Sequence, residues 1–202
     1  IGNTLYFSAN DGTNTELWKS DGTEAGTVMV KNIRSGSSSS YPELLTAIGN
    51  TLYFSANDGT NGTELWKSDG TASGTAMVKD INNGSSSIYR DGSGSGSSCY
   101  ELTAIGNTLY FQADDGIHGC ELWKSDGTPS GTVMVKDINS GSGSSSDFYY
   151  YPPSTSVGNT LYFIADDGTN GYELWKSDGT ANGTMMVKDI YSGSGSSNSY
   201  YA

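Results

Sequence analysis

One long phrase recurs four times along this chain of 202 residues, and the repetition constrains the fold more than any other feature. Each copy runs from Gly-Asn-Thr-Leu-Tyr-Phe through Glu-Leu-Trp-Lys-Ser-Asp-Gly-Thr to Met-Val-Lys. The copies differ mainly in the Gly/Ser/Tyr-rich stretches between them, so we expect the phrase to be a structural unit and the stretch a loop. The sequence thus indicates one repeat domain of four units, numbered first to fourth: 1–47, 48–104, 105–156 and 157–202.

Within a unit, segments rich in β-forming residues alternate with turn residues. In the first unit we expect strands at Thr4–Ala9, Glu16–Lys19 and Thr27–Ile33, and a weaker strand at Pro42–Ala47, just before the second copy. Gly-Asn, Asp-Gly and Ser-Asp-Gly-Thr between the segments are typical of tight turns. Each unit should therefore form four antiparallel strands, with essentially no helix.

Apolar side chains occur on both faces of the expected strands, which indicates that both faces are covered. Leu5 and Phe7 should point one way and Tyr6 the other, while Leu17 and Trp18 also divide between the faces. Four-stranded blades stacked around an axis provide such cover. We therefore predict an all-β, β-propeller-like fold of four-stranded antiparallel blades, and rank a linear β-solenoid second.

How the blades close is left open by the sequence. The last residues, Ser-Asn-Ser-Tyr-Tyr-Ala, stand where the strand before the next unit would be, so they could complete the first blade. That arrangement would give a closed four-bladed ring. The alternative is that the four units are part of a larger array.

The octapeptide Glu-Leu-Trp-Lys-Ser-Asp-Gly-Thr resembles the ELWxxDGT repeat of bacterial exported proteins. The resemblance implies a secreted, extracellular or cell-surface repeat protein. It provides no established catalytic activity that could be transferred to this chain. All four units carry the octapeptide, at 16–23, 64–71, 121–128 and 173–180.

The charge of the chain excludes some partners. Its 10 Lys and Arg against 22 Asp and Glu give a net charge of −12, which repels nucleic acid and anionic membrane surfaces. No apolar run reaches the roughly 18 to 20 residues that a membrane helix needs. The start, Ile-Gly-Asn-Thr-Leu, has no Met and no signal-peptide features, so we expect a processed or excised part of a longer protein.

The tryptophan of each unit has two interpretations. It could be an aromatic platform for a sugar ring, as in a carbohydrate-binding, lectin-like propeller. It could instead pack between blades, where burial of a large side chain contributes about 1.5 to 3 kcal/mol. The packing interpretation is the stronger one for these four residues: Trp18, Trp66, Trp123 and Trp175.

Two sets of acidic residues also recur. The Asp of Ser-Asp-Gly-Thr is explained by hydrogen bonds to the amides of its own turn. The acidic residues before the other Gly turn are candidate calcium ligands, although the spacing lacks an EF-hand loop. Calcium is therefore a candidate ion, and no cofactor is required. These candidate ligands are Asp11, Asp58, Asp114, Asp115, Asp166 and Asp167.

The remaining special residues favour structure over chemistry. His118 is the only histidine, and no Ser/His/Asp or His/Cys set can be assembled, so we predict that the protein is not an enzyme. Cys99 and Cys120 both belong to the third blade, which suggests a local disulfide, with two free thiols as the alternative.

Three asparagines stand in glycosylation sequons: Asn61, Asn83 and Asn182. The Gly/Ser/Tyr-rich loops are either adaptable contact surfaces or linkers. We expect a non-enzymatic structural or adhesive protein of the cell surface, matrix or a filament, whose partners are itself or other surface components. A glycan-binding propeller and a calcium-dependent adhesin are the alternatives.

Overall fold

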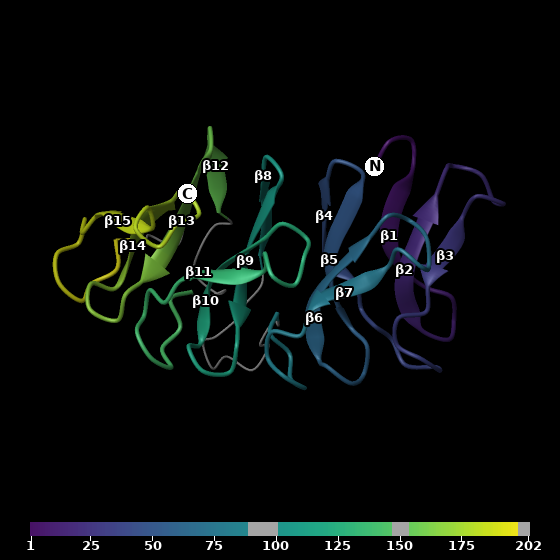
Figure 1. The fold of residues 1–202 in the computed structure, drawn as a ribbon, viewed down its shortest axis with the longest axis horizontal. Coiled ribbons are helices and arrows are strands. Elements are labelled where there is room, and N and C mark those ends of the chain that lie inside the picture. Colours follow the sequence, from purple (N-terminus) through teal and green to yellow (C-terminus); the bar gives the residue numbers. More distant parts are fainter. Residues whose placement is uncertain (89–100, 147–153, 198–202) are drawn as a thin grey trace.

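A computed structural model describes residues 1–88, 101–146 and 154–197 of the chain. These residues form fifteen β-strands in four antiparallel sheets, and no helix occurs among them (Figure 1). Each strand pairs with its neighbours in sequence, so the order in every sheet follows the chain. The predicted all-β fold of antiparallel sheets is confirmed.

The strands repeat from unit to unit with nearly the same bounds. The first sheet contains β1 (Leu5–Asn10), β2 (Thr15–Ser20) and β3 (Val28–Lys31). The second contains β4 (Glu43–Ile48), β5 (Thr51–Asn57), β6 (Thr63–Ser68) and β7 (Ala76–Lys79). The third contains β8 (Leu102–Ile105), β9 (Thr108–Asp114), β10 (Cys120–Ser125) and β11 (Val133–Lys136). The fourth contains β12 (Thr155–Val157), β13 (Thr160–Asp166), β14 (Tyr172–Ser177) and β15 (Met185–Lys188).

Turn chemistry fixes the register of these sheets. Ile48 pairs with Thr51 across the two-residue turn Gly49-Asn50, and Gly49 has the positive φ of 57° that the first position of such a turn takes. The central hairpin then pairs Phe54 with Trp66 on one face of the sheet. The pairing of β6 with β7 shifts register between Leu65 and Trp66, which is the pattern of a β-bulge. The other units have the same shift between Leu and Trp.

The four sheets follow one another along the long axis of the molecule (Figure 1). The sheet of β1–β3 lies at one end and the sheet of β12–β15 at the other, while β4 contacts β8 between them. Within the described ranges, no strand pairing joins the first sheet to the fourth. The first sheet has three strands there, and residues 198–202 of the predicted closing segment lie outside the described residues.

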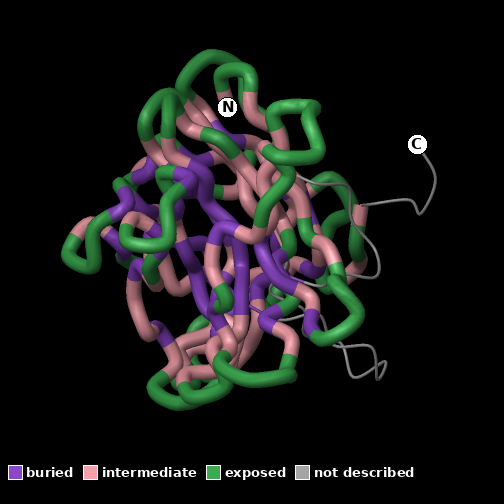
Figure 2. The backbone as a smooth tube through the Cα atoms, turned by 90° about the vertical axis from the view of Figure 1, so that its right-hand side faces the viewer, coloured by how far each residue is buried: buried purple, intermediate pink, exposed green. Residues whose placement is uncertain are grey.

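The core of the described residues consists of three apolar clusters, one between each pair of successive sheets, and buried residues line the interior of the row (Figure 2). Each cluster takes one set of side chains from one unit and a different set from the next. Among the described residues, no helix is long and apolar enough to cross a membrane.

Candidate functional site: the interface between units

Every unit has two different faces, and the geometry of the hairpin sets them. Because side chains alternate along a strand, Leu52, Phe54 and Ala56 of the second unit lie on the same face as Trp66. Tyr53 lies on the other face, together with Leu65 and Lys67 of the next strand. We call the first the tryptophan face and the second the lysine face. The lysine face of the second unit contains Tyr53, Leu65, Lys67, Val78, Lys79 and Ile81. The tryptophan face of the third unit contains Leu109, Phe111, Ala113, Trp123, Gly127 and Thr132.

These two faces pack against each other in one apolar cluster. Leu65, Leu109 and Phe111 are almost fully buried, and Phe111 lies 6.5 Å from Trp123 between ring centroids. The equivalent side chains form the clusters between the first and second units and between the third and fourth. The three internal interfaces are therefore copies of one design.

A lysine from one unit binds the tryptophan of the next. Lys79 Nζ lies 5.7 Å from the centre of the Trp123 ring and donates a hydrogen bond to the Thr132 carbonyl at 2.9 Å. An ammonium over an indole face is attracted by the ring quadrupole, and the attraction grows when water is excluded. The same pair of contacts occurs at the other two interfaces, from Lys31 to Trp66 and Thr75, and from Lys136 to Trp175 and Thr184.

A second lysine and a tyrosine hold the Ser-Asp-Gly-Thr turn of the next unit. Lys67 Nζ donates to the Gly127 carbonyl at 2.8 Å, and the Tyr53 hydroxyl lies against the Gly127 backbone. Burial, and then the charge of Asp126, raise the pKa of Tyr53, so the phenol remains protonated. Gly127 has a φ of 86° and leaves no room for a side chain, which explains the glycine in this turn. Lys19 and Lys124 make the same bond to Gly70 and Gly179.

A buried glutamate ties the linker between units. Glu64 accepts hydrogen bonds from the Ile81 and Ser87 amides at 3.1 Å each and from the Ser87 hydroxyl at 2.5 Å. The Ser87 carbonyl then accepts the amide of Asp114, in the third unit, at 2.9 Å. Glu64 thus fixes the linker that the next unit binds. Glu16 and Glu121 make corresponding contacts.

Burial raises the pKa of Glu64 and of Glu121 to about 7, although their hydrogen bonds favour the charged form. At Glu173, in the fourth unit, burial also raises the pKa, but the hydrogen bonds outweigh it and the net pKa is lowered. The roles of these glutamates and lysines at the interface were not predicted from the sequence. Their occurrence in all four units was the available signal.

The structure places the four tryptophans at or beside these interfaces. Trp66, Trp123 and Trp175 are buried, and a lysine of the preceding unit covers each ring. Their ring faces are occupied within the protein, which favours the packing interpretation over a sugar platform. Trp18, in the first unit, is partly exposed.

The candidate calcium ligands are occupied by their own turns. Asp58 Oδ1 accepts the Thr60 and Asn61 amides at 2.8 Å each, which fixes the loop between β5 and β6. Asp11, Asp115 and Asp167 do the same, while Asp114 and Asp166 accept the amide of the following glycine. In the part of the chain that is described, no group of three His, Cys, Asp or Glu side chains could hold a metal ion.

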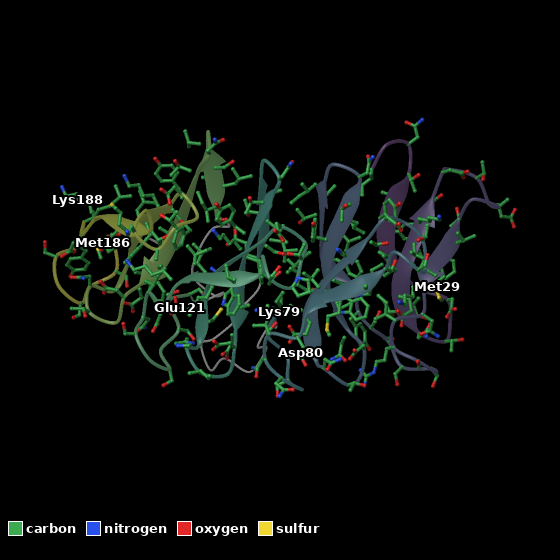
Figure 3. All side chains as sticks on the ribbon, viewed as in Figure 1. Met29, Lys79, Asp80, Glu121, Met186 and Lys188 are labelled. Carbon is green, nitrogen blue, oxygen red and sulfur yellow. The ribbon has the colours of Figure 1, made fainter. Side chains whose placement is uncertain are left out.

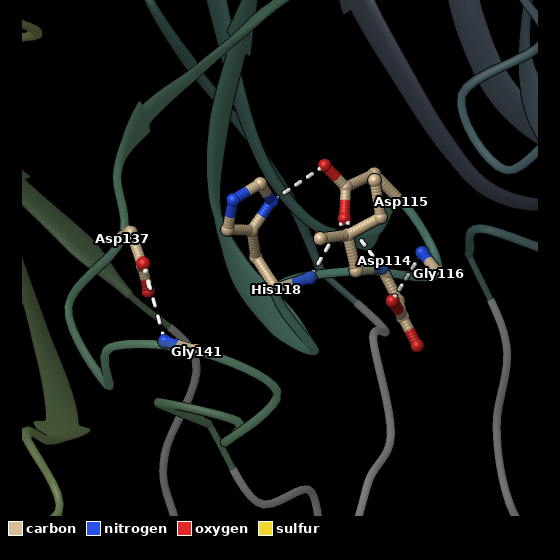
Figure 4. A network of polar contacts seen from close by, with 7 residues as sticks. Asp114, Asp115, Gly116, His118, Asp137 and Gly141 are labelled. Atoms are coloured by element: carbon tan, nitrogen blue, oxygen red, sulfur yellow. Dashed lines mark hydrogen bonds and ion pairs between the residues drawn. The ribbon is translucent and has the colours of Figure 1, made fainter.

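The single histidine belongs to the same type of turn (Figure 4). His118 Nδ1 lies 2.8 Å from Asp115 Oδ2, and this hydrogen bond raises the pKa of His118. Asp114 and Asp137 each accept the amide of a nearby glycine, Gly116 and Gly141, so the carboxylates drawn beside the imidazole serve as loop anchors.

Of the predicted cysteine and sequon residues, all but Cys99 lie in the described part of the chain. Cys120 begins β10 and is buried, with the Ser146 hydroxyl 3.0 Å from its sulfur. Cys99 lies outside the described residues, so their pairing stays a prediction. Asn83 and Asn182 are exposed, whereas the amide of Asn61 donates to Asp58 Oδ2 at 2.7 Å.

Comparisons with known proteins bear on the fold. No family model and no curated protein matches the chain. A solved structure of a puromycin hydrolase mutant complexed with PGG is similar, with a TM-score of 0.52 and 14% identity over 93% of this chain and 28% of that one. A structure from a study of two prolyl endopeptidases has a TM-score of 0.53 and 13% identity over 92% of this chain and 24% of that one.

The fold is β-propeller-like. The similarity follows the row of antiparallel sheets over more than nine-tenths of this chain, which agrees with the predicted blades. The chain spans about a quarter of the length of these solved structures. At such low identity the likeness concerns the fold alone.

Proposed function

We propose that this chain is a non-enzymatic structural or adhesive repeat protein, secreted or held at the cell surface, where it is part of a matrix or filament. One observation carries the proposal: the same charged and aromatic residues build all three interfaces between units. Lys79 binds Trp123, and Glu64 anchors the linker to the next unit. The side chains that recur in every unit therefore hold neighbouring units together rigidly.

Extracellular placement is supported by the octapeptide resemblance and by the acidic surface. A net charge of −12 favours solubility and discourages contact with nucleic acid. The Gly/Ser/Tyr-rich loops differ in length and sequence from unit to unit, although serines within them, such as Ser40 and Ser87, bind the buried glutamates. Such loops suit adaptable contacts with other surface components.

The location can be tested by fractionating the native cells and probing each fraction with an antibody against the chain. We expect the signal in the medium or the surface fraction, with ordered material under immunogold electron microscopy. A cytosolic protein of the same cells serves as the control for lysis. Signal confined to the cytosol would reject the proposal.

A further inference from the structure

The two ends of the row present different uncovered faces. At the first unit the tryptophan face lacks a neighbour: Leu5 is 64% exposed, whereas its equivalent Leu109 is 0% exposed. Gly22 and Thr27 are also exposed, although the matching residues of the other units are buried. Met29, which pairs with Trp18 on this side of the first sheet, lies toward one end of the molecule (Figure 3).

At the fourth unit the lysine face lacks a neighbour. Ile190 is 59% exposed, whereas Ile81 at the same position of the second unit is 9% exposed. Val187 and Lys188 are exposed as well. Lys188 lies toward the opposite end of the molecule from Met29, so the two uncovered faces belong to different ends of the row (Figure 3).

We propose that the lysine face of the fourth unit binds the tryptophan face of the first unit in a second copy of the chain. The inference rests on the proposed function and names the partner of the scaffold. Three internal interfaces show that these two faces fit, because each joins the same residue types in the same order. The sequences at the two ends retain these residue types.

The internal interfaces also specify the contacts. The hydroxyl of Tyr162 should lie against Gly22, as that of Tyr53 lies against Gly127. The ammonium of Lys188 should cover Trp18 and donate to the Thr27 carbonyl, as Lys79 does at the next unit.

Apolar contact completes the interface. Val187 and Ile190 should cover Leu5 and Phe7, as Val78 and Ile81 cover the third unit. Because the two faces differ and lie at opposite ends, the contact is head to tail. Each further copy adds to the same row of units, and the rotation from one unit to the next sets how many copies close a ring.

Analytical ultracentrifugation of the chain over a range of micromolar concentrations tests the proposal. We expect the average mass to rise with concentration above that of one chain. Ile190→Glu and Leu5→Glu each place a charge in the interface while remaining exposed in a single copy. A buried charge without a partner costs several kcal/mol, so each variant should associate about 100-fold more weakly. Ile117→Glu, in an exposed loop outside both faces, is the matched control.

Mixing the two face variants gives the sharpest result. Ile190→Glu retains an intact tryptophan face and Leu5→Glu an intact lysine face, so the mixture should form one-to-one dimers that grow no further. Lys188→Glu is a second variant of the lysine face at an exposed side chain, and circular dichroism checks that each variant is folded.

A wild-type chain that stays monomeric, a mixture that does not dimerise, or an equal effect of Ile117→Glu would overturn the inference. None of these results changes the cellular location, so the proposed function and this inference can fail separately.

Discussion

Replacing Gly127 by alanine should weaken the interface between the second and third units. A methyl group at this position would lie 2.2 Å from the Tyr53 hydroxyl oxygen, closer than atoms can approach. Tyr53 is only 6% exposed and packs in the apolar cluster, so it cannot move aside freely. Gly22 occupies the same turn of the first unit, with a φ of 92° against 86° at Gly127, but a methyl group there would meet no atom within 4 Å.

The pair of glycines separates two effects of the substitution. Both variants place alanine in a left-handed conformation, which costs about 1–2 kcal/mol at either site. Gly127→Ala adds overpacking, which typically costs about 1–3 kcal/mol. The free energy of unfolding should therefore fall by about 1–3 kcal/mol more for Gly127→Ala than for Gly22→Ala.

Urea unfolding at one low protein concentration measures the free energy of unfolding of both glycine variants. Removal of the Tyr53 hydroxyl then tests whether this group causes the larger loss in Gly127→Ala. Adding Tyr53→Phe to Gly127→Ala leaves the ring carbon as the nearest atom, 3.2 Å from the methyl position. The double variant should recover part of the loss, as a double-mutant cycle would show. Equal losses at the two glycines, or no coupling between Gly127 and Tyr53, would refute this reasoning.

Three further outcomes follow from the contacts within the row. The free energy of unfolding should fall as pH rises from about 4.5 to about 7, because folded Glu64 and Glu121 retain protons that the unfolded chain releases. Urea titrations across this window should show the fall, and replacing both residues with glutamine should flatten it; a rising profile in the wild type would contradict the assignment. Lys79→Ala should lose about 1–2 kcal/mol in the same assay, whereas Lys188→Ala, at the uncovered end, should change stability by less than about 0.5 kcal/mol; equal losses would exclude the lysine–tryptophan contact as the cause. EDTA should leave the melting temperature unchanged, because backbone amides occupy the Asp-Gly turn carboxylates, and a lowered melting temperature would instead support calcium.

The strands were predictable because their signals are local. The predicted Thr4–Ala9 differs from β1 (Leu5–Asn10) by one residue at each end, and the predicted Pro42–Ala47 likewise differs from β4 (Glu43–Ile48). Alternation of side chains and turn residues act over a few positions, so one unit is enough to read them. The division of Leu17 and Trp18 between the two faces was predicted for the same reason.

The interface could not be derived in the same way, because its partners are far apart in the chain. Lys79 and the carbonyl that it binds are separated by 53 positions, and Glu64 and Ser87 by 23. Repetition indicates that these residues matter, but it does not show which groups meet. Whether sheets close into a ring depends on the angle between blades, which no residue pattern within a unit reports.

The exposed residues of the fourth unit show how far each unit depends on the next. Ile81 packs against the third unit and is 9% exposed, whereas Ile190, at the same position of the fourth unit, is 59% exposed. Val78 is 3% exposed, and its counterpart Val187 is 46% exposed. The lysine face of a unit is therefore buried only where another unit packs against it, so each unit depends on the next to complete its own core.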